Sequence, residues 1–215
     1  HFNFNYFFLM LFETTYNELL KSSKGLYKEK GSKFISYAYV VKSENQIKEI
    51  IRDLKTKEKN ARHFCYGYIL KPDKSIINFN DDGEPSNTAG KPILNQIKSK
   101  ELTNCLIVVV RYFGGVKLGI TGLIRAYKNA ALDALQKNKI QSFDITEQYR
   151  LIFTYDEMNN VMRVIKKLNI NIISQINKEN TIIECKVSLK NSDTFLNEIK
   201  KNHKVKVEYS STNNN

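Results

Sequence analysis

An unbroken apolar run from Leu106 to Val110 constrains the fold of this chain more than any other stretch. The run is too short for a typical helix, and its lack of polar alternation suits a β-strand that is covered on both faces. Gly114 and Gly115 follow soon after it, where the backbone can turn or come close to another group. The pattern predicts a central strand in a layered fold, with a loop at its end.

A long helix is predicted to follow this loop, beginning near Thr121. Apolar residues recur there at helical spacing, namely Ile120, Leu123, Ile124, Tyr127, Ala130, Ala131, Ala134 and Leu135. The free N–H groups and the dipole of the helix N-terminus, with Lys117 before it and Arg125 and Lys128 on its polar side, suit a phosphate or a carboxylate. An ordinary helix whose glycines only make the turn fits the same pattern.

The loop has neither P-loop spacing nor the G-x-G-x-x-G fingerprint of dinucleotide-binding folds. It remains a candidate for binding phosphate groups in general. The residues assigned to phosphate or RNA binding are Arg111, Gly114, Gly115, Lys117, Gly119, Thr121, Arg125 and Lys91.

An acidic loop precedes the central strand in the sequence. Asp81, Asp82 and Glu84 lie within four residues, and Gly83 and Pro85 favour a turn that could bring the carboxylates together. Such a loop could hold Mg²⁺ or share acid–base work, with His63 as a further base or ligand. The favoured interpretation is structural: His63 makes an ordinary hydrogen bond, and the loop, Asp82 in particular, pairs with Arg111. No metal ligand and no catalytic residue is therefore assigned.

Four segments are distinctive in their order and composition: ARHFCYGY, DDGEPSNTAGKP, VVVRYFGGVKLG and GLIRAY. Over about residues 24 to 142 they closely resemble the YigZ/IMPACT family of translation-associated proteins, and the remainder resembles the second domain of the bacterial YigZ branch. The resemblance implies an α+β N-terminal domain, with the fold of a small-subunit ribosomal protein's second domain and of domain IV of elongation factor G. It also implies a ferredoxin-like C-terminal domain, and eukaryotic relatives that regulate translation in response to amino-acid starvation.

This chain departs from the family pattern at His63-Phe64, at Asn87-Thr88-Ala89-Gly90 and at the segment from Leu118 to Leu123. Each departure lies in a loop that would closely contact any ligand. The departures count against a demanding catalytic geometry more than against a binding surface.

The chain of 215 residues is long enough for two α+β domains, which we place at 10–142 and 143–210. The second domain shows strand and helix patterns in the order βαββαβ, which is ferredoxin-like. Residues 1–9 are interpreted as a mis-set start before Met10, and 211–215 as a disordered tail. Cys65, Cys105 and Cys185 are far apart and odd in number, which indicates reduced core residues in a cytoplasmic protein.

Most of the positive charge lies in the first domain. Residues 143–215 carry 11 Lys and Arg against 9 Asp and Glu, which leaves 23 against 13 in residues 1–142. Such a field favours polyanions such as nucleic acid, although a lysine-rich surface also serves solubility. Four tyrosines alternate on predicted strands and could stack bases, but aromatic residues at this spacing are more often in a core: Tyr37, Tyr39, Tyr66 and Tyr68.

The expected function is that of a cytoplasmic, translation-associated regulator that binds RNA or the ribosome, without catalytic turnover, a cofactor or a membrane partner. Two alternatives stay open. One is a Mg²⁺-dependent hydrolase of a phosphate compound that uses Asp81, Asp82 and Glu84. The other is a protein-interaction module that contacts a translation regulator.

Overall fold

The computed structural model describes residues 14–213 and places them in two compact units. The first unit comprises Tyr16–Phe143, and the second comprises the described chain from Asp144 onward, together with residues 14 and 15. The expectation for residues 1–9 lies outside the described residues. Over 14–213, no helix is long and apolar enough to cross a membrane.

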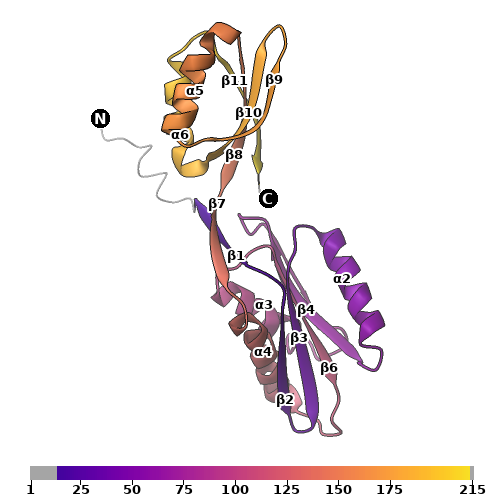
Figure 1. Ribbon diagram of the computed structural model, residues 1–215. Coiled ribbons are helices and arrows are strands. Elements are labelled where there is room, and N and C mark those ends of the chain that lie inside the picture. The colour runs from indigo at the N-terminus through magenta and orange to yellow at the C-terminus, as the bar shows by residue number, and fades with distance from the viewer. Residues whose placement is uncertain (1–13, 214–215) are drawn as a thin grey trace, which may run out of the picture. The chain divides into compact units, whose positions relative to one another are not determined.

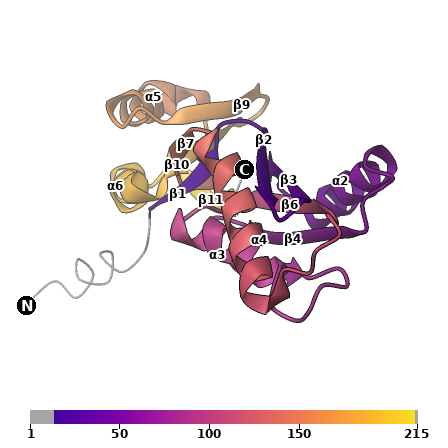
Figure 2. The same ribbon diagram turned by 90° about the horizontal axis from the view of Figure 1, so that it is seen from below.

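A five-stranded antiparallel sheet forms the centre of the first unit, in the order β2-β3-β6-β4-β5 (Figure 1). The strands are β2 (Ser23–Glu29), β3 (Ser32–Val40), β4 (His63–Leu70), β5 (Ile76–Asn80) and β6 (Cys105–Tyr112). Helices α3 (Gly90–Ser99) and α4 (Gly119–Gln136) pack on one face, and α2 (Glu44–Lys57) packs on the other. Figure 2 shows α4 and α2 on opposite sides of the strands.

Strand β6 lies in the middle of this sheet, as the apolar run predicts. Leu106, Val108 and Val110 contribute to the core under α2, and Ile107 and Val109 contribute to the core under α3 and α4. All five side chains are fully buried. Because both faces of β6 are covered, the run needs no polar alternation.

Ser43 with Gln46 three residues later predicts a capping box at the start of a helix, and Ser43 is indeed the N-cap of α2. The Ser43 hydroxyl accepts a hydrogen bond from the Gln46 backbone N–H at 3.3 Å. The Gln46 side chain accepts its bond from the backbone N–H of Lys42, one residue before the cap. In a standard capping box the Gln46 side chain would accept from the N–H of the N-cap Ser43. Here it accepts instead from the N–H of the residue before the cap.

Three strands and one helix of this unit were not predicted. Strand β1 (Thr15–Leu19) pairs with β7 (Ile140–Asp144), although the polar residues from Asn138 to Ile145 predict only a connection between domains. The polar and basic residues 16–30 predict no strand, because β2 is an edge strand in which Gly25 is the one buried residue. Helix α3 was missed because Gly90 and Pro92 lie in its first turn and the preceding loop carries its cap.

The second unit has the order β8 (Thr146–Phe153), α5 (Met158–Lys167), β9 (Asn171–Asn177), β10 (Thr181–Ser188), α6 (Leu189–Lys200) and β11 (Lys206–Asn213). Its antiparallel strands are arranged β11-β8-β10-β9, and alternate residues of β10 are buried. This is the predicted ferredoxin-like βαββαβ arrangement.

Two details of this unit differ from expectation. The alternation of Leu151, Phe153 and Tyr155 predicts that Tyr155 lies on the first strand of this unit, but Tyr155 lies in a 3-10 turn (Tyr155–Glu157) and is 70% exposed. The segment that we expected to be disordered from Ser211 instead continues β11 to Asn213, because it pairs with β8 beyond a bulge.

Candidate functional site

The acidic loop connects β5 to α3, and its first carboxylate closes the N-terminus of that helix. Oδ1 of Asp81 accepts hydrogen bonds from the backbone N–H groups of Ala89 at 3.0 Å and Gly90 at 2.8 Å. Oδ2 accepts a third from Asn87 at 2.9 Å. A carboxylate in this place satisfies free helix N–H groups and interacts favourably with the helix dipole. Asp81 therefore acts as the helix's own anion.

Asp82 and His63 hold the loop against the start of β4. Oδ2 of Asp82 accepts a hydrogen bond from the Phe64 backbone N–H at 2.6 Å, and Oδ1 lies 3.8 Å from the Lys55 ammonium. The Asp82 carbonyl oxygen lies 2.8 Å from Nδ1 of His63, which donates to it. His63 thus has a backbone partner rather than a carboxylate partner.

The third carboxylate, Glu84, makes the ion pair that we expected for Asp82. Its Oε1 atom lies 2.6 Å from Nη1 of Arg111, and these two side chains are only 5% and 8% exposed. The same oxygen accepts a hydrogen bond from the Tyr127 hydroxyl at 2.8 Å. The Arg111 guanidinium lies over the rings of Phe34 and Phe113, at 5.5 and 5.6 Å. Arg111 was expected to contact phosphate, but its charge is buried and paired inside the protein.

The Glu84 network extends to a buried thiol. Sγ of Cys65 donates to the Tyr127 hydroxyl at 3.4 Å. Burial raises the pKa of the Cys65 thiol and the pKa of the Tyr127 hydroxyl. Both groups are therefore neutral hydrogen-bonding partners, and the thiol is a poor nucleophile.

The three carboxylates of the acidic loop point into three different sets of hydrogen bonds. Over residues 14–213, no group of three His, Cys, Asp or Glu side chains could hold a metal ion. The arrangement gives Asp81, Asp82 and Glu84 partners of their own within the protein. The side chains of Asp81, Asp82 and Glu84 therefore do not meet at one point.

The glycine-rich loop, residues 113–118, and the first residue of α4 together contain three glycines, of which Gly114 is closely packed and Gly115 and Gly119 are open. A Cβ atom on Gly114 would lie 1.9 Å from the carbonyl carbon of Gly31, in the turn between β2 and β3. Gly115 and Gly119 have φ angles of +88° and +70°, and a Cβ atom on either would meet nothing within 4 Å. The close approach at Gly114 is therefore to the protein's own backbone, while Gly115 and Gly119 serve the turn.

Helix α4 begins at Gly119, and Leu118 at its N-cap offers no side-chain hydrogen bond. Lys117 and Thr121 beside this N-terminus are exposed, and Lys117 has no ion pair among the described residues. Arg125 is also exposed but forms an ion pair with Glu29 of β2. Lys91 is exposed on the first turn of α3, so it belongs to the other helix N-terminus.

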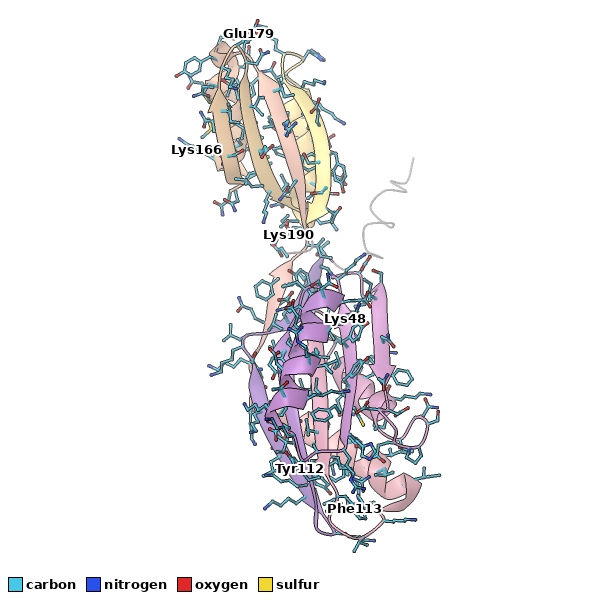
Figure 3. All side chains as sticks on the ribbon, turned by 90° about the vertical axis from the view of Figure 1, so that its right-hand side faces the viewer. Lys48, Tyr112, Phe113, Lys166, Glu179 and Lys190 are labelled. Atoms are coloured by element: carbon cyan, nitrogen blue, oxygen red, sulfur yellow. The ribbon has the colours of Figure 1, made fainter. Side chains whose placement is uncertain are left out.

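Apolar side chains surround the same helix start, which sequence reasoning missed. Phe113, Val116, Ile120 and Ile124 are 52%, 50%, 64% and 39% exposed. The helical spacing predicts Ile120 and Ile124 on the buried face. Ile120 is in phase with the buried stripe of α4 but lies in its uncovered first turn, and Ile124 lies at the side of that stripe. Figure 3 labels Tyr112 and Phe113 at this end of the unit.

Comparisons with known proteins agree with the fold and with the family resemblance of the sequence motifs. The family model of the Impact N-terminal domain matches residues 30–135. An IMPACT family member of Haemophilus influenzae is 33% identical over 172 residues, which are 79% of this chain and 84% of that protein. The IMPACT family member YigZ of Escherichia coli is 31% identical over 147 residues, which are 67% of this chain and 72% of that protein.

A solved structure, described as the crystal structure of an hypothetical protein, has the same fold. The structural alignment covers 95% of this chain and 100% of the solved chain, with a TM-score of 0.68 and 23% sequence identity. The similarity therefore includes both units. With these sequence matches, the chain belongs to the IMPACT family, in agreement with the YigZ/IMPACT resemblance of its motifs.

Proposed function

We propose that the protein regulates translation by binding RNA or the ribosome, through the glycine-rich loop and the N-terminus of α4, without catalytic turnover. The translation part of this proposal comes from the family resemblance. The binding part comes from the contrast between the two helices that follow the loops.

The observation that carries the proposal is that, among the residues the structure describes, α3 holds an anion of its own and the N-cap of α4 has no side-chain hydrogen bond. Three backbone N–H groups at and before the start of α3 donate to the Asp81 carboxylate. At the start of α4, no side chain caps the helix, and the exposed Lys117 stands beside the free N–H groups. Free N–H groups, a helix dipole and a lysine together favour a phosphate.

The charge of the first unit supports the same conclusion. Residues 1–142 carry 23 Lys and Arg against 13 Asp and Glu. The three carboxylates of the acidic loop form hydrogen bonds or an ion pair with other groups of the protein. The remaining positive field attracts a polyanion without specifying its sequence. These internal partners also make the hydrolase reaction at Asp81, Asp82 and Glu84 the weaker hypothesis, because each carboxylate would first have to leave them.

A second candidate function is a protein-interaction module that contacts a translation regulator. One observation favours it: Phe113, Val116, Ile120 and Ile124 expose large apolar side chains around the same helix start. Apolar groups gathered on an exposed surface are typical of protein contacts. Their contribution to binding would depend little on salt.

The test is ribosome co-sedimentation, and binding to ribosomal RNA, at several salt concentrations. Lys117→Glu should weaken binding and reduce the slope of log affinity against log salt by about 1, because one phosphate contact is lost. Lys139→Glu is the matched control, since Lys139 is also exposed in the first unit but lies between α4 and β7, beyond the other end of the helix.

Equal losses from Lys117→Glu and Lys139→Glu would mean that only bulk charge matters, and would count against this interface. Ile120→Ser separates the two candidates. A loss of binding from Ile120→Ser with an unchanged salt slope, together with no effect of Lys117→Glu, would favour the protein-interaction module.

A further inference from the structure

A second surface of the first unit has the side chains that an unpaired nucleotide needs. A groove of about 580 Å³ lies between α2 and the strands β4 and β5. This groove is on the sheet face opposite to α3 and α4, so it is separate from the helix start that contains Gly119 and Thr121. Figure 3 shows α2 in front of the sheet, with Lys48 labelled on it.

One wall of the groove is positively charged. Lys48, Arg52 and Lys55 follow one another at intervals of four and three residues, which places them on the same face of α2. Arg52 lies 3.8 Å from Asp53, but both side chains are about three-quarters exposed, at 75% and 77%, so this contact is loose. Lys48 is exposed and has no ion pair within residues 14–213.

The carboxylate in the groove does not cancel this charge. Asp82 is the only acidic side chain among the described residues that line it. Asp82 accepts the Phe64 N–H at 2.6 Å and lies 3.8 Å from Lys55. The positive charge of Lys55 therefore balances the negative charge of Asp82. The positive charges of Lys48 and Arg52 can then interact with a bound anion.

The floor of the groove is aromatic and carries an amide at its edge. Phe64 and Tyr66 come from β4, and the Lys55 ammonium lies 5.6 Å from the centre of the Phe64 ring. Tyr66 is half-buried, and its ring stacks on that of Tyr68 at 6.2 Å and 15°. Asn80 is exposed and pairs with Tyr66 in the β4–β5 register; its side chain accepts the Asp82 backbone N–H at 2.6 Å and also hydrogen-bonds to the Tyr66 side chain, which fixes the amide at the edge of the groove.

We propose that this groove binds an unpaired nucleotide of an RNA strand, with the base on Tyr66 and the adjacent phosphates on Lys48 and Arg52. An aromatic ring stacks on the face of any base, an amide can bond to a base edge, and cations bind the backbone. A base within a duplex cannot lie on Tyr66, because its neighbours cover both of its faces. The inference rests on the proposed function for the choice of RNA as partner, and it narrows that partner to single-stranded RNA.

The experiment measures the affinity of the full chain for a short fluorescent oligouridine, and for an RNA duplex of the same length, by fluorescence anisotropy. We expect the single strand to bind more tightly than the duplex. Tyr66→Ala should lower affinity for the single strand by about tenfold, the typical effect of losing one stacked base, and Tyr66→Phe should retain it. Arg52→Glu should lower affinity and reduce the salt slope by about 1.

Lys139→Glu serves as the control for charge, since Lys139 is exposed and lines no part of the groove. Arg52 is exposed on a helix surface, so Arg52→Glu tests the groove even where Tyr66→Ala lowers the melting temperature. Equal losses from Arg52→Glu and Lys139→Glu would overturn the inference. Equal affinities for the duplex and the single strand would do the same, and uridine monophosphate binding as tightly as the oligouridine would point to a free nucleotide instead.

The two proposals fail in different ways. If Lys117→Glu weakens RNA or ribosome binding while Arg52→Glu and Tyr66→Ala do not, the groove is wrong and the proposed function stands. If the groove variants weaken oligouridine binding while Lys117→Glu leaves ribosome binding unchanged, the groove stands and the helix start is wrong. No binding of RNA or of the ribosome by the unmutated protein would overturn both.

Discussion

The acidic loop and the glycine-rich loop have the same position in the fold but differ at the helix that follows each of them. Each leaves a strand of the same sheet and runs directly into a helix, from β5 to α3 and from β6 to α4. The acidic loop turns its carboxylates inward, where Asp81 closes α3 and Glu84 holds Arg111. The glycine-rich loop leaves the start of α4 without a side-chain cap and with Lys117 exposed. The density of charge in the sequence therefore did not indicate which loop leaves its helix start uncapped and exposed.

The largest expected effect is a loss of folding stability when the buried ion pair between Arg111 and Glu84 of the acidic loop is broken. Arg111→Met should lower the free energy of unfolding by about 3–5 kcal/mol, because Glu84 would be left as a buried charge without its partner. Urea denaturation measures this loss. Lys117→Met removes an exposed charge and should change stability by less than about 0.5 kcal/mol. Equal stabilities of the Arg111 and Lys117 variants would show that the acidic loop is not held inward as described.

A smaller effect is expected where the glycine-rich loop meets the β2–β3 turn. In Gly114→Ala, the new methyl group would meet the Gly31 backbone, so either the loop or the turn must move. Overpacking of this kind costs about 1–3 kcal/mol. The thermal midpoint should fall, and ribosome binding should fall with it if this loop is the interface. An unchanged midpoint would mean that the loop is not fastened at Gly114.

The elements predicted correctly from the sequence are those whose pattern is set by burial. The apolar run of β6, the Ser43-capped helix α2 and the alternation in β10 each reflect a face that packs on a core. Strand β2 has no such face, because it lies at an edge and buries only Gly25. Its pairing with β3 depends on the tertiary arrangement, which the local sequence does not encode.

The site was predicted less well, for a related reason. Helix α3 is capped by Asp81, nine residues before Gly90, so the usual signal of a capping residue directly before the helix is missing. The sequence correctly placed a carboxylate of the acidic loop near Arg111, but the choice of Asp82 was wrong, since the turn geometry brings Glu84 there instead. The sequence also did not predict that Ile120 is exposed. Helical spacing predicts which face of a helix packs on the core, but not how far along the helix that packing extends.

The Glu29–Arg125 ion pair provides the smallest expected effect, and its pH dependence can be stated with its sign. It is the contact by which β2 holds the exposed side of α4, at the glycine-rich end. The hydrogen bond from the Arg125 guanidinium, together with its positive charge, lowers the pKa of the Glu29 carboxyl below its usual value of 4.5. A carboxyl whose pKa is lowered by folding adds stability above its unfolded pKa, and that stability is lost as the pH falls through the folded pKa.

Arg125→Gln removes this contribution, because the Glu29 carboxyl then loses its cationic partner. The unmutated protein should be slightly more stable than Arg125→Gln near neutral pH, and the difference should shrink as the pH falls below about 4.5. Urea unfolding at a series of acidic pH values measures it. High salt should reduce the difference at neutral pH, because the guanidinium is exposed. A difference that stays constant into acid would mean that Arg125 acts on α4 through packing, which would leave its charge free for a phosphate.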